Sequence, residues 1–302
     1  MGLFDRFRKK KKAPQRNLAE EDVKNLAFMV HLLFKEKTLM PSRERMTQVM
    51  RKHLGAVDCF SYDEKFAAFA VKKHLVQLKE GKMPVELMVT DCLNMADFPI
   101  DRATRSQMWD CPESSRILEE CQYHICAIDV MAYMLPHKDR ANLDMDYLEA
   151  LVELFPECEA VYFQNSGKLF AREKVAAHVF SGEDRFIHFA VNARFFNIEG
   201  TDEHIIDTLG MGLLGLPDVQ YHFHDFDPNW IVYHAYNLAS YICGGEKQIE
   251  DGDHIDGIKD GEIDVDIRWW CHYENSMIQP DRPVIDICMN EYAAGKRDYK
   301  RK

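Results

Sequence analysis

Residues 185–228 read RFIHFAVNARFFNIEGTDEHIIDTLGMGLLGLPDVQYHFHDFDP, and this stretch constrains the fold more than any other. Its segments 186–196 and 219–223 alternate apolar and polar residues with a period of two, which is the pattern of half-buried β-strands. Between them, Ile205, Ile206 and Leu209 follow Thr201 at helical spacing. The stretch therefore predicts a strand, a short helix and a second strand.

The order strand, helix, strand also occurs twice earlier in the chain. Predicted strands at 26–34 and 57–60 flank a helix that begins at Ser42, and strands at 123–131 and 160–163 flank a helix that ends before Pro156. Strand-to-strand spacings of roughly 30 to 36 residues are what a β-α-β unit requires. The three segments therefore predict a repeated architecture.

Further elements are predicted around these units. A hairpin joins 66–78 to 85–89, Gly167 turns the chain after 160–163, and a helix runs from Asp227 and Pro228 to Gly244, before strands at 263–270 and 284–288. We predict an α+β, or mixed α/β, protein of repeated β-α-β units, with mixed sheets and helices packed on one face. The predicted domains are residues 19–180 and 181–294, between basic tails at 1–18 and 295–302.

Composition indicates a globular protein of two domains. The chain has 302 residues, of which 46% are apolar, and no apolar run approaches the roughly 20 residues that span a bilayer. The N-terminus lacks the pattern of a signal peptide. Nine cysteines at irregular spacing, without a CxxC motif, favour reduced thiols and a cytoplasmic location.

Charge is unevenly distributed, because basic tails flank an acidic body and the formal net charge is −12. An acidic body repels phosphates, so we do not expect nucleic-acid binding. Leu3, Phe4 and Phe7 stand beside the basic run 8–12, so a weak peripheral membrane contact by residues 1–12 is one interpretation. A solvated tail is the other.

A polar sheet face is the main candidate for a binding site. Alternation places His188, Asn192 and Arg194 on one side of the first strand, and Gln220, His222 and His224 on one side of the second. If the two strands are neighbours, this face could bind an anionic ligand through Arg194 and protonated imidazole. The alternative is a half-solvated face that is polar for no functional reason.

A divalent metal site is the second candidate. The residues are His222, His224, Asp225 and Asp227, because two imidazoles at i and i+2 can converge with a carboxylate. Local spacing fixes no third ligand, so the cofactor stays unknown.

Three other motifs are weaker. The acidic run 250–266 fails the EF-hand pattern, because Ile255 and Asp256 stand where an oxygen ligand and a glycine are required. It predicts an acidic, glycine-rich connector, with a loose surface calcium loop as the alternative. Ser166-Gly167-Lys168 lacks the earlier glycine of a phosphate loop. Cys111 is expected to be a buried thiol rather than a nucleophile.

Three segments together resemble an uncharacterised bacterial family, domain of unknown function 4261. They are SQMWDCPES (106–114), FPECEAVYFQNSGKLF (155–170) and FFNIEGTDEHIIDTLGMGLLGLPDVQYHFHDFDP (195–228). The resemblance implies a C-terminal domain over about Phe186 to Cys288 and extends upstream to about Leu26. It implies no reaction and no catalytic residues.

We favour a non-catalytic intracellular protein that binds a protein partner or a small ligand through the polar sheet face. The alternative is a metal-assisted, hydrolase-like enzyme that uses His222, His224 and Asp225 or Asp227, with His188 or Arg194 assisting.

Overall fold

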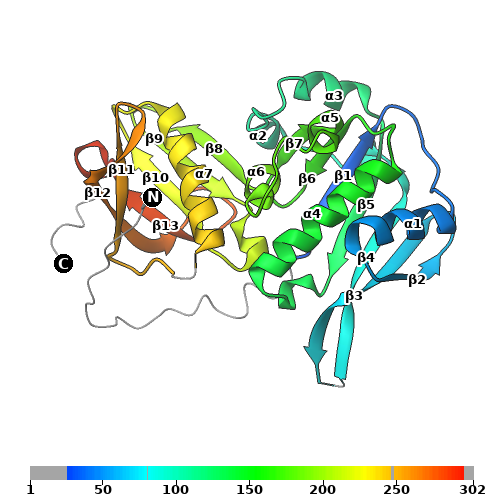
Figure 1. Ribbon diagram of the computed structural model, residues 1–302. Coiled ribbons are helices and arrows are strands. Elements are labelled where there is room, and N and C mark those ends of the chain that lie inside the picture. The colour runs from blue at the N-terminus through cyan, green and yellow to red at the C-terminus, as the bar shows by residue number, and fades with distance from the viewer. Residues whose placement is uncertain (1–25, 80, 246–247, 296–302) are drawn as a thin grey trace. The chain divides into compact units, whose positions relative to one another are not determined.

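The computed structural model describes residues 26–79, 81–245 and 248–295 (Figure 1). The membrane contact predicted for residues 1–12, the basic tail 1–18 and residues 296–302 of the C-terminal tail lie outside this part. The described chain forms two compact units, residues 26–192 and 193–295, each with its own sheet, and the predicted α+β class is confirmed. The predicted division at residues 180/181 remains a prediction.

The unit of residues 26–192 is built on a seven-stranded sheet of order β2-β3-β4-β5-β1-β6-β7. All of its recorded strand pairs are antiparallel. Its strands are β1 Met29–Phe34, β2 Val57–Tyr62, β3 Phe66–Leu78, β4 Gly81–Asn94, β5 Tyr123–Val130, β6 Ala160–Phe163 and β7 Lys168–Ala171.

The helices of this unit include the two that the sequence predicts here, one that begins at Ser42 and one that ends before Pro156. Ser42 caps α1, since its Oγ accepts the N–H of Arg45 at 3.2 Å, and the helix buries its apolar face against the long helix α4. The helices are α1 Arg43–Leu54, α2 Arg102–Arg105, α3 Ser114–Glu120, α4 His137–Leu154, α5 Arg172–Ala176 and α6 Arg185–Ala190, with 3₁₀ turns η1 Met95–Asp97 and η2 Ala132–Met134.

Two of the three predicted β-α-β connections exist, although neither joins adjacent strands. α4 connects β5 to β6, and β1 lies between them, antiparallel to both. α1 connects β1 to β2, which are separated by three other strands in the sheet. The sequence spacing was therefore informative about the connections but not about strand order.

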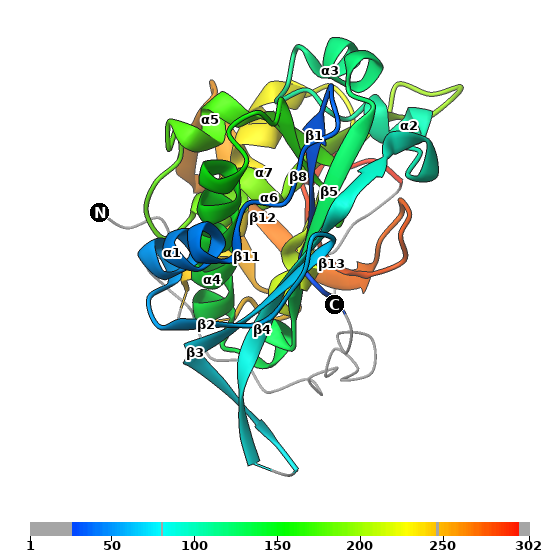
Figure 2. The same ribbon diagram turned by 90° about the vertical axis from the view of Figure 1, so that its right-hand side faces the viewer.

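The β3–β4 hairpin extends beyond the rest of its sheet (Figures 1 and 2). Residues 75–78 of β3 pair with residues 81–84 of β4, whereas the pairing of β3 with β2 ends at Val71 and that of β4 with β5 ends at Glu86. Lys73, Lys79 and Lys82 lie exposed on this extension. Lysines on free strand edges disfavour edge-to-edge pairing with other chains.

The unit of residues 193–295 holds a six-stranded mixed sheet of order β11-β12-β13-β10-β9-β8. The β10–β13 pair is parallel, and the other recorded pairs are antiparallel. Its elements are β8 Asn192–Asn197, β9 His204–Leu209, η3 Met211–Leu214, β10 Asp218–Phe223, α7 Pro228–Gly244, β11 His254–Lys259, β12 Glu262–Asn275, β13 Pro283–Cys288 and η4 Asn290–Tyr292.

The prediction of one strand over 186–196 was wrong in its first half. Residues 185–190 form α6, which buries Phe186, Ile187, Phe189 and Ala190, and only the second half is the strand β8. Buried apolar residues at i, i+1, i+3 and i+4 fit a helical face as well as an alternating strand over so short a run. His188 therefore lies on a helix and not on the sheet.

The helix predicted from Thr201 was also wrong, because residues 204–209 form the strand β9. Gly200 has a φ of 80°, and the hydroxyl of Thr201 donates to the carbonyl of Ile198, so this segment is the turn of a β8–β9 hairpin. The β-branched residues Ile205, Ile206 and Thr208 favour a strand. The third predicted unit is therefore a series of antiparallel strands, β8, β9 and β10.

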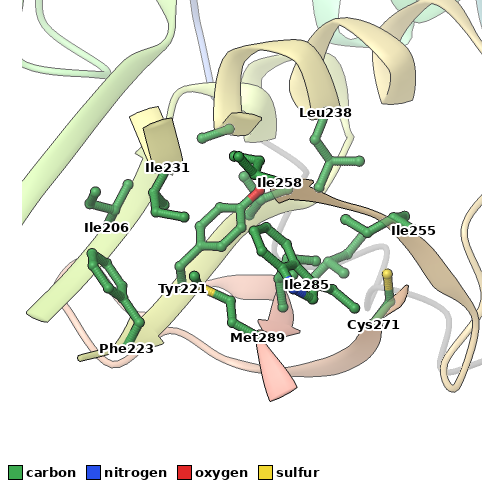
Figure 3. Close-up of a cluster of buried hydrophobic side chains, with 14 of the residues drawn as sticks. Ile206, Tyr221, Phe223, Ile231, Leu238, Ile255, Ile258, Cys271, Ile285 and Met289 are labelled. Carbon is green, nitrogen blue, oxygen red and sulfur yellow. The ribbon is translucent and has the colours of Figure 1, made fainter. Parts of the chain in front are cut away.

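Helix α7 covers one face of the second sheet. Asp227 caps it by accepting the N–H of Asn229 at 2.9 Å, Pro228 occupies its first turn, and Gly245 follows its end, as predicted. Figure 3 shows the ring of Tyr221 among apolar side chains from α7 and the sheet, including Ile231, Ile258 and Ile285. The polar positions of β10 therefore point to the opposite face.

Candidate functional site

Three of the six predicted sheet-face residues lie together on the face opposite α7. Gln220 of β10 is directly paired with Asp207 of β9, and Arg194 of β8 binds Asp207 with both its Nε and Nη2 atoms, at 2.9 and 2.6 Å. His222 follows two residues after Gln220 on the same strand. This row matches the predicted face, with β9 inserted between the two predicted strands.

The row is a buried network rather than an open surface. Asp207 and Gln220 are fully buried, and Arg194 is 8% exposed. Gln220 donates to Asp286 at 3.0 Å and to Glu274 at 3.1 Å. Arg194, Asp207 and Gln220 are hydrogen-bonded within this network, which is the condition under which buried polar groups are tolerated. The buried Nδ1 atom of His222, in contrast, has no hydrogen-bond partner among the described residues.

The loop between β12 and β13 closes this face. Arg282 donates to Asp207 at 2.7 Å and to Asp218 at 2.9 Å, while the N–H of Met277 donates to Gln220 and the carbonyl of Gln279 accepts from Arg194. Desolvation lowers the pKa of Arg282, but the carboxylates of Asp218 and Asp207 outweigh it, so the pKa is raised. Arg282 therefore remains charged and holds the loop on the sheet.

The other predicted face residues lie elsewhere. His188 hydrogen-bonds Asp184, the N-cap residue of α6, at 3.3 Å and stacks on Phe180. Asn192 is buried and donates to the carbonyls of Gln107 and Ser166, both at 3.3 Å. His224 lies beyond the end of β10. These three side chains do not share a site with Arg194.

The four predicted metal ligands do not converge. His222 Nε2 hydrogen-bonds Glu203 at 2.8 Å, His224 Nδ1 hydrogen-bonds Asp225 at 2.9 Å, and Asp227 caps α7. Within residues 26–79, 81–245 and 248–295, no group of three or more His, Cys, Asp or Glu side chains is arranged to hold a metal ion. The geometry gives this set local structural roles.

Two weaker motifs also have structural roles. Lys168, in the Ser166-Gly167-Lys168 turn, is buried and donates to the carbonyls of His188 at 2.7 Å and Val191 at 2.8 Å, so it caps the end of α6. Cys111 is buried, and burial raises the pKa of its thiol. A raised pKa disfavours the thiolate that a nucleophile needs.

An aromatic groove in the unit of residues 193–295 is the feature that sequence reasoning missed. Its volume is about 690 Å³, and its lining comprises Phe226 and Trp230 at the start of α7, residues 258–260, 264 and 266–270 of the β11–β12 hairpin, and residues 289–292. We call these residues the aromatic groove. Phe226 makes edge-to-face contacts with Trp230, Trp269 and Tyr292 at centroid distances of 5.7, 5.9 and 4.9 Å.

The turn of the β11–β12 hairpin shapes one wall of the aromatic groove. Asp260 and Gly261 have φ values of 51° and 85°, the left-handed conformations that a tight two-residue hairpin turn needs. A Cβ atom on Gly261 would lie 3.0 Å from Nε1 of Trp230, so glycine lets the indole approach the turn. Asp-Gly between alternating residues is a hairpin signal, and the acidic connector predicted for 250–266 was wrong.

Comparison with known proteins identifies part of the chain. Residues 207–288 match the model of a family described as domain of unknown function (DUF4261). This chain is a DUF4261 domain-containing protein. The matched segment of the DUF4261 domain starts within β9 and ends with β13, so it includes Trp230, the β11–β12 hairpin and Arg282. No curated protein and no solved structure matches the chain.

No helix in the described part of the DUF4261 domain-containing protein is long and apolar enough to cross a membrane.

Proposed function

We propose that this DUF4261 domain-containing protein is a non-catalytic binding protein, and that its ligand or partner binds in the aromatic groove. The observation that carries the proposal is the gathering of aromatic rings around one solvent-open hollow. Trp230 is 36% exposed there, while Trp269 and Met289 form a buried floor. Partly exposed aromatic side chains beside an apolar floor are typical of ligand and partner sites.

The polar sheet face does not offer a comparable site. Its central residues, Asp207 and Gln220, are fully buried, and the β12–β13 loop occupies the space above them. A ligand at that face would have to displace Arg282, which would take the cation from the buried carboxylate of Asp218 and leave Asp207 with Arg194 alone. Breaking a buried ion pair costs about 3 to 5 kcal/mol, so the aromatic groove is the more accessible surface.

Fluorine NMR of protein labelled with 5-fluorotryptophan tests the proposal. The chain has four tryptophans, of which Trp230, Trp269 and Trp270 line the aromatic groove, and Trp109 lies in the other unit as an internal control. The probes are butylammonium, butanol and butyrate, which share a short apolar chain and differ in charge. We expect at least one probe to shift the Trp230 or Trp270 resonance saturably and to leave Trp109 unchanged.

In the Trp230→Ala variant, the probe should no longer shift the fluorine resonance of Trp270. If none of the three probes moves a groove tryptophan at millimolar concentration, or if Trp109 moves equally, the aromatic groove is not a ligand site.

A further inference from the structure

The charges around the aromatic groove determine which ligands it accepts. Asp260, Asp264, Asp266 and Glu291 line it, together with the cations Lys259 and Arg268. Arg268 forms an ion pair at 2.8 Å with Asp256, a buried carboxylate outside the lining. The positive charge of Arg268 is therefore already matched, and the rim has an excess of negative charge.

The surrounding unit adds to this field. Residues 193–295 contain twenty Asp and Glu against five Lys and Arg. A hollow with an excess of negative charge on such a body attracts cations. Anionic ligands are disfavoured for the same reason.

The aromatic rings suit a cation as well. A Lys ammonium or Arg guanidinium over the ring of Trp or Tyr is stabilised by about 0.5 to 2 kcal/mol, and the stabilisation is largest over tryptophan. Trp230 and Tyr292 both line the aromatic groove and are linked through Phe226. Aromatic rings and carboxylates around one hollow are therefore two separate features that favour the same class of ligand.

The distribution of polar groups favours a long side chain over a compact polar molecule. The buried lining residues, Ile258, Trp269 and Met289, are all apolar, whereas the acidic groups lie nearer the rim. A site for a small polar ligand usually has polar groups placed deep inside to orient it. Lys and Arg have an apolar stem and a charged end, which matches an apolar floor with an acidic rim.

We propose that the aromatic groove binds a basic segment of a partner protein. The Lys or Arg side chains of this segment contact the rings of Trp230 and Tyr292 on one side. On the other side they face the carboxylates of Asp264, Asp266 and Glu291. This inference rests on the proposed function and adds the chemical class of the partner.

The experiment titrates the full-length protein into a fluorescein-labelled peptide of alternating Lys and Ser, with fluorescence anisotropy as the readout. The reference peptide has Glu in place of every Lys. We expect saturable binding of the Lys peptide and none of the Glu peptide. Binding should weaken when salt rises from about 50 to about 300 mM, because added ions screen the rim carboxylates.

Two matched variants separate the aromatic groove from general attraction. Asp264→Asn with Asp266→Asn should weaken Lys-peptide binding about three- to tenfold. Glu199→Gln with Asp202→Asn removes the same charge from exposed positions outside the groove and should change binding less than about twofold. Equal weakening by both pairs would overturn the proposal, because it would show non-specific attraction.

The aromatic contribution has its own test. Trp230→Ala should weaken binding about three- to tenfold at both salt concentrations, since cation–π contacts in a partly dry groove are screened less than rim charges. Unchanged affinity in Trp230→Ala would overturn the proposal. So would Lys-peptide binding that appears only after deletion of residues 296–302, because it would make the chain's own basic segment the occupant.

Failure of this inference is distinguishable from failure of the proposed function. If butanol or butyrate shifts the groove tryptophans while the Lys peptide does not bind, the aromatic groove remains a ligand site and only the basic partner is excluded.

Discussion

Asp207 is the residue on which the polar face of the second sheet depends. It is fully buried and accepts hydrogen bonds from both Arg194 and Arg282. Each guanidinium is almost completely removed from water, so neither has a solvent alternative to the carboxylate. Asp207 therefore fixes both the β8 edge and the β12–β13 loop.

Asp207→Ala should lower the free energy of unfolding by about 3 to 5 kcal/mol, because two buried cations lose their shared carboxylate. Urea denaturation followed by tryptophan fluorescence measures this, since three of the four tryptophans belong to the same unit. Asp202→Ala removes an exposed carboxylate and should change the value by less than about 0.5 kcal/mol. Equal effects of the two substitutions would contradict a buried network.

His234 links helix α7 to the core and to the β11 backbone. Its Nδ1 hydrogen-bonds the Tyr221 hydroxyl at 2.7 Å and its Nε2 the carbonyl of Asp256 at 2.9 Å. A carbonyl only accepts, so Nε2 carries the proton and Nδ1 accepts from Tyr221. Burial lowers the pKa of His234 to about 4, partly offset by the bond to Asp256.

The stability contributed by neutral His234 should depend on pH. The unfolded chain takes up a proton near the ordinary pKa of 6.5, and the folded protein only near 4, so stability is complete above pH 6.5 and is lost as the pH falls toward 4. The loss is about 3 kcal/mol. The glutamine of His234→Gln does not titrate. The difference in free energy of unfolding between this variant and wild type should therefore change by about 3 kcal/mol between pH 6.5 and pH 4.

Urea denaturation at a series of pH values checks this prediction. Tyr221→Phe removes the hydroxyl but keeps the imidazole, so its difference from wild type should vary much less with pH. A constant difference between wild type and His234→Gln from pH 7 to pH 4 would contradict a buried neutral imidazole.

At the scale of elements, the β11–β12 hairpin positions the wall of the aromatic groove. Gly261→Ala and Gly200→Ala both place a side chain at positive φ and should each cost about 1 kcal/mol. Only the Gly261 variant crowds Trp230, whereas nothing lies within 4 Å of a Cβ on Gly200. Gly261→Ala alone should therefore shift the Trp230 fluorine resonance and weaken Lys-peptide binding.

The comparison of the two glycine variants separates strain from shape. Thermal unfolding reports the strain, and fluorine NMR with peptide titration reports the position of Trp230. If both variants shift Trp230 equally, the indole does not rest against the turn.

Elements with strong local signals could be predicted from the sequence, and short ambiguous ones could not. α1 and α7 have caps and long apolar stripes, so their limits were predictable. The alternation of β10 correctly placed Gln220 and His222 on one face. Residues 186–190 fit both a strand and a helix, and the end of the helix that forms is capped by Lys168, which lies twenty residues before His188 in the chain.

The candidate site was harder to predict because its parts are distant in the chain. Arg282 closes the polar face although it lies 75 residues from Asp207, so alternation could not show that the face is covered. The aromatic groove combines α7, a hairpin and residues 289–292, and no local motif marks that combination. Only the Asp260-Gly261 turn gave a signal in the sequence.

At the scale of the whole molecule, α6 belongs with the first sheet. Lys168 of β7 binds the carbonyls of His188 and Val191, and Phe189 packs against Phe170. The fragment 26–192 should therefore be more stable than the fragment 26–180 by about 3 kcal/mol, because removal of α6 takes two backbone acceptors from the Lys168 ammonium, leaving it its ion pair with Asp110, and uncovers Phe170. Urea denaturation followed by circular dichroism measures this, and equal stabilities would favour the boundary predicted at 180/181.

Backbone amide shifts of the deuterated, full-length protein saturated with the Lys peptide test most directly whether the aromatic groove is the binding site. We predict that the largest shifts fall on residues 226–230, 258–270 and 289–292, and that amides of Arg194, Asp207 and Gln220 change little. Shifts centred on those three residues, or on residues 26–192, would contradict a binding site in the aromatic groove of the DUF4261 domain-containing protein.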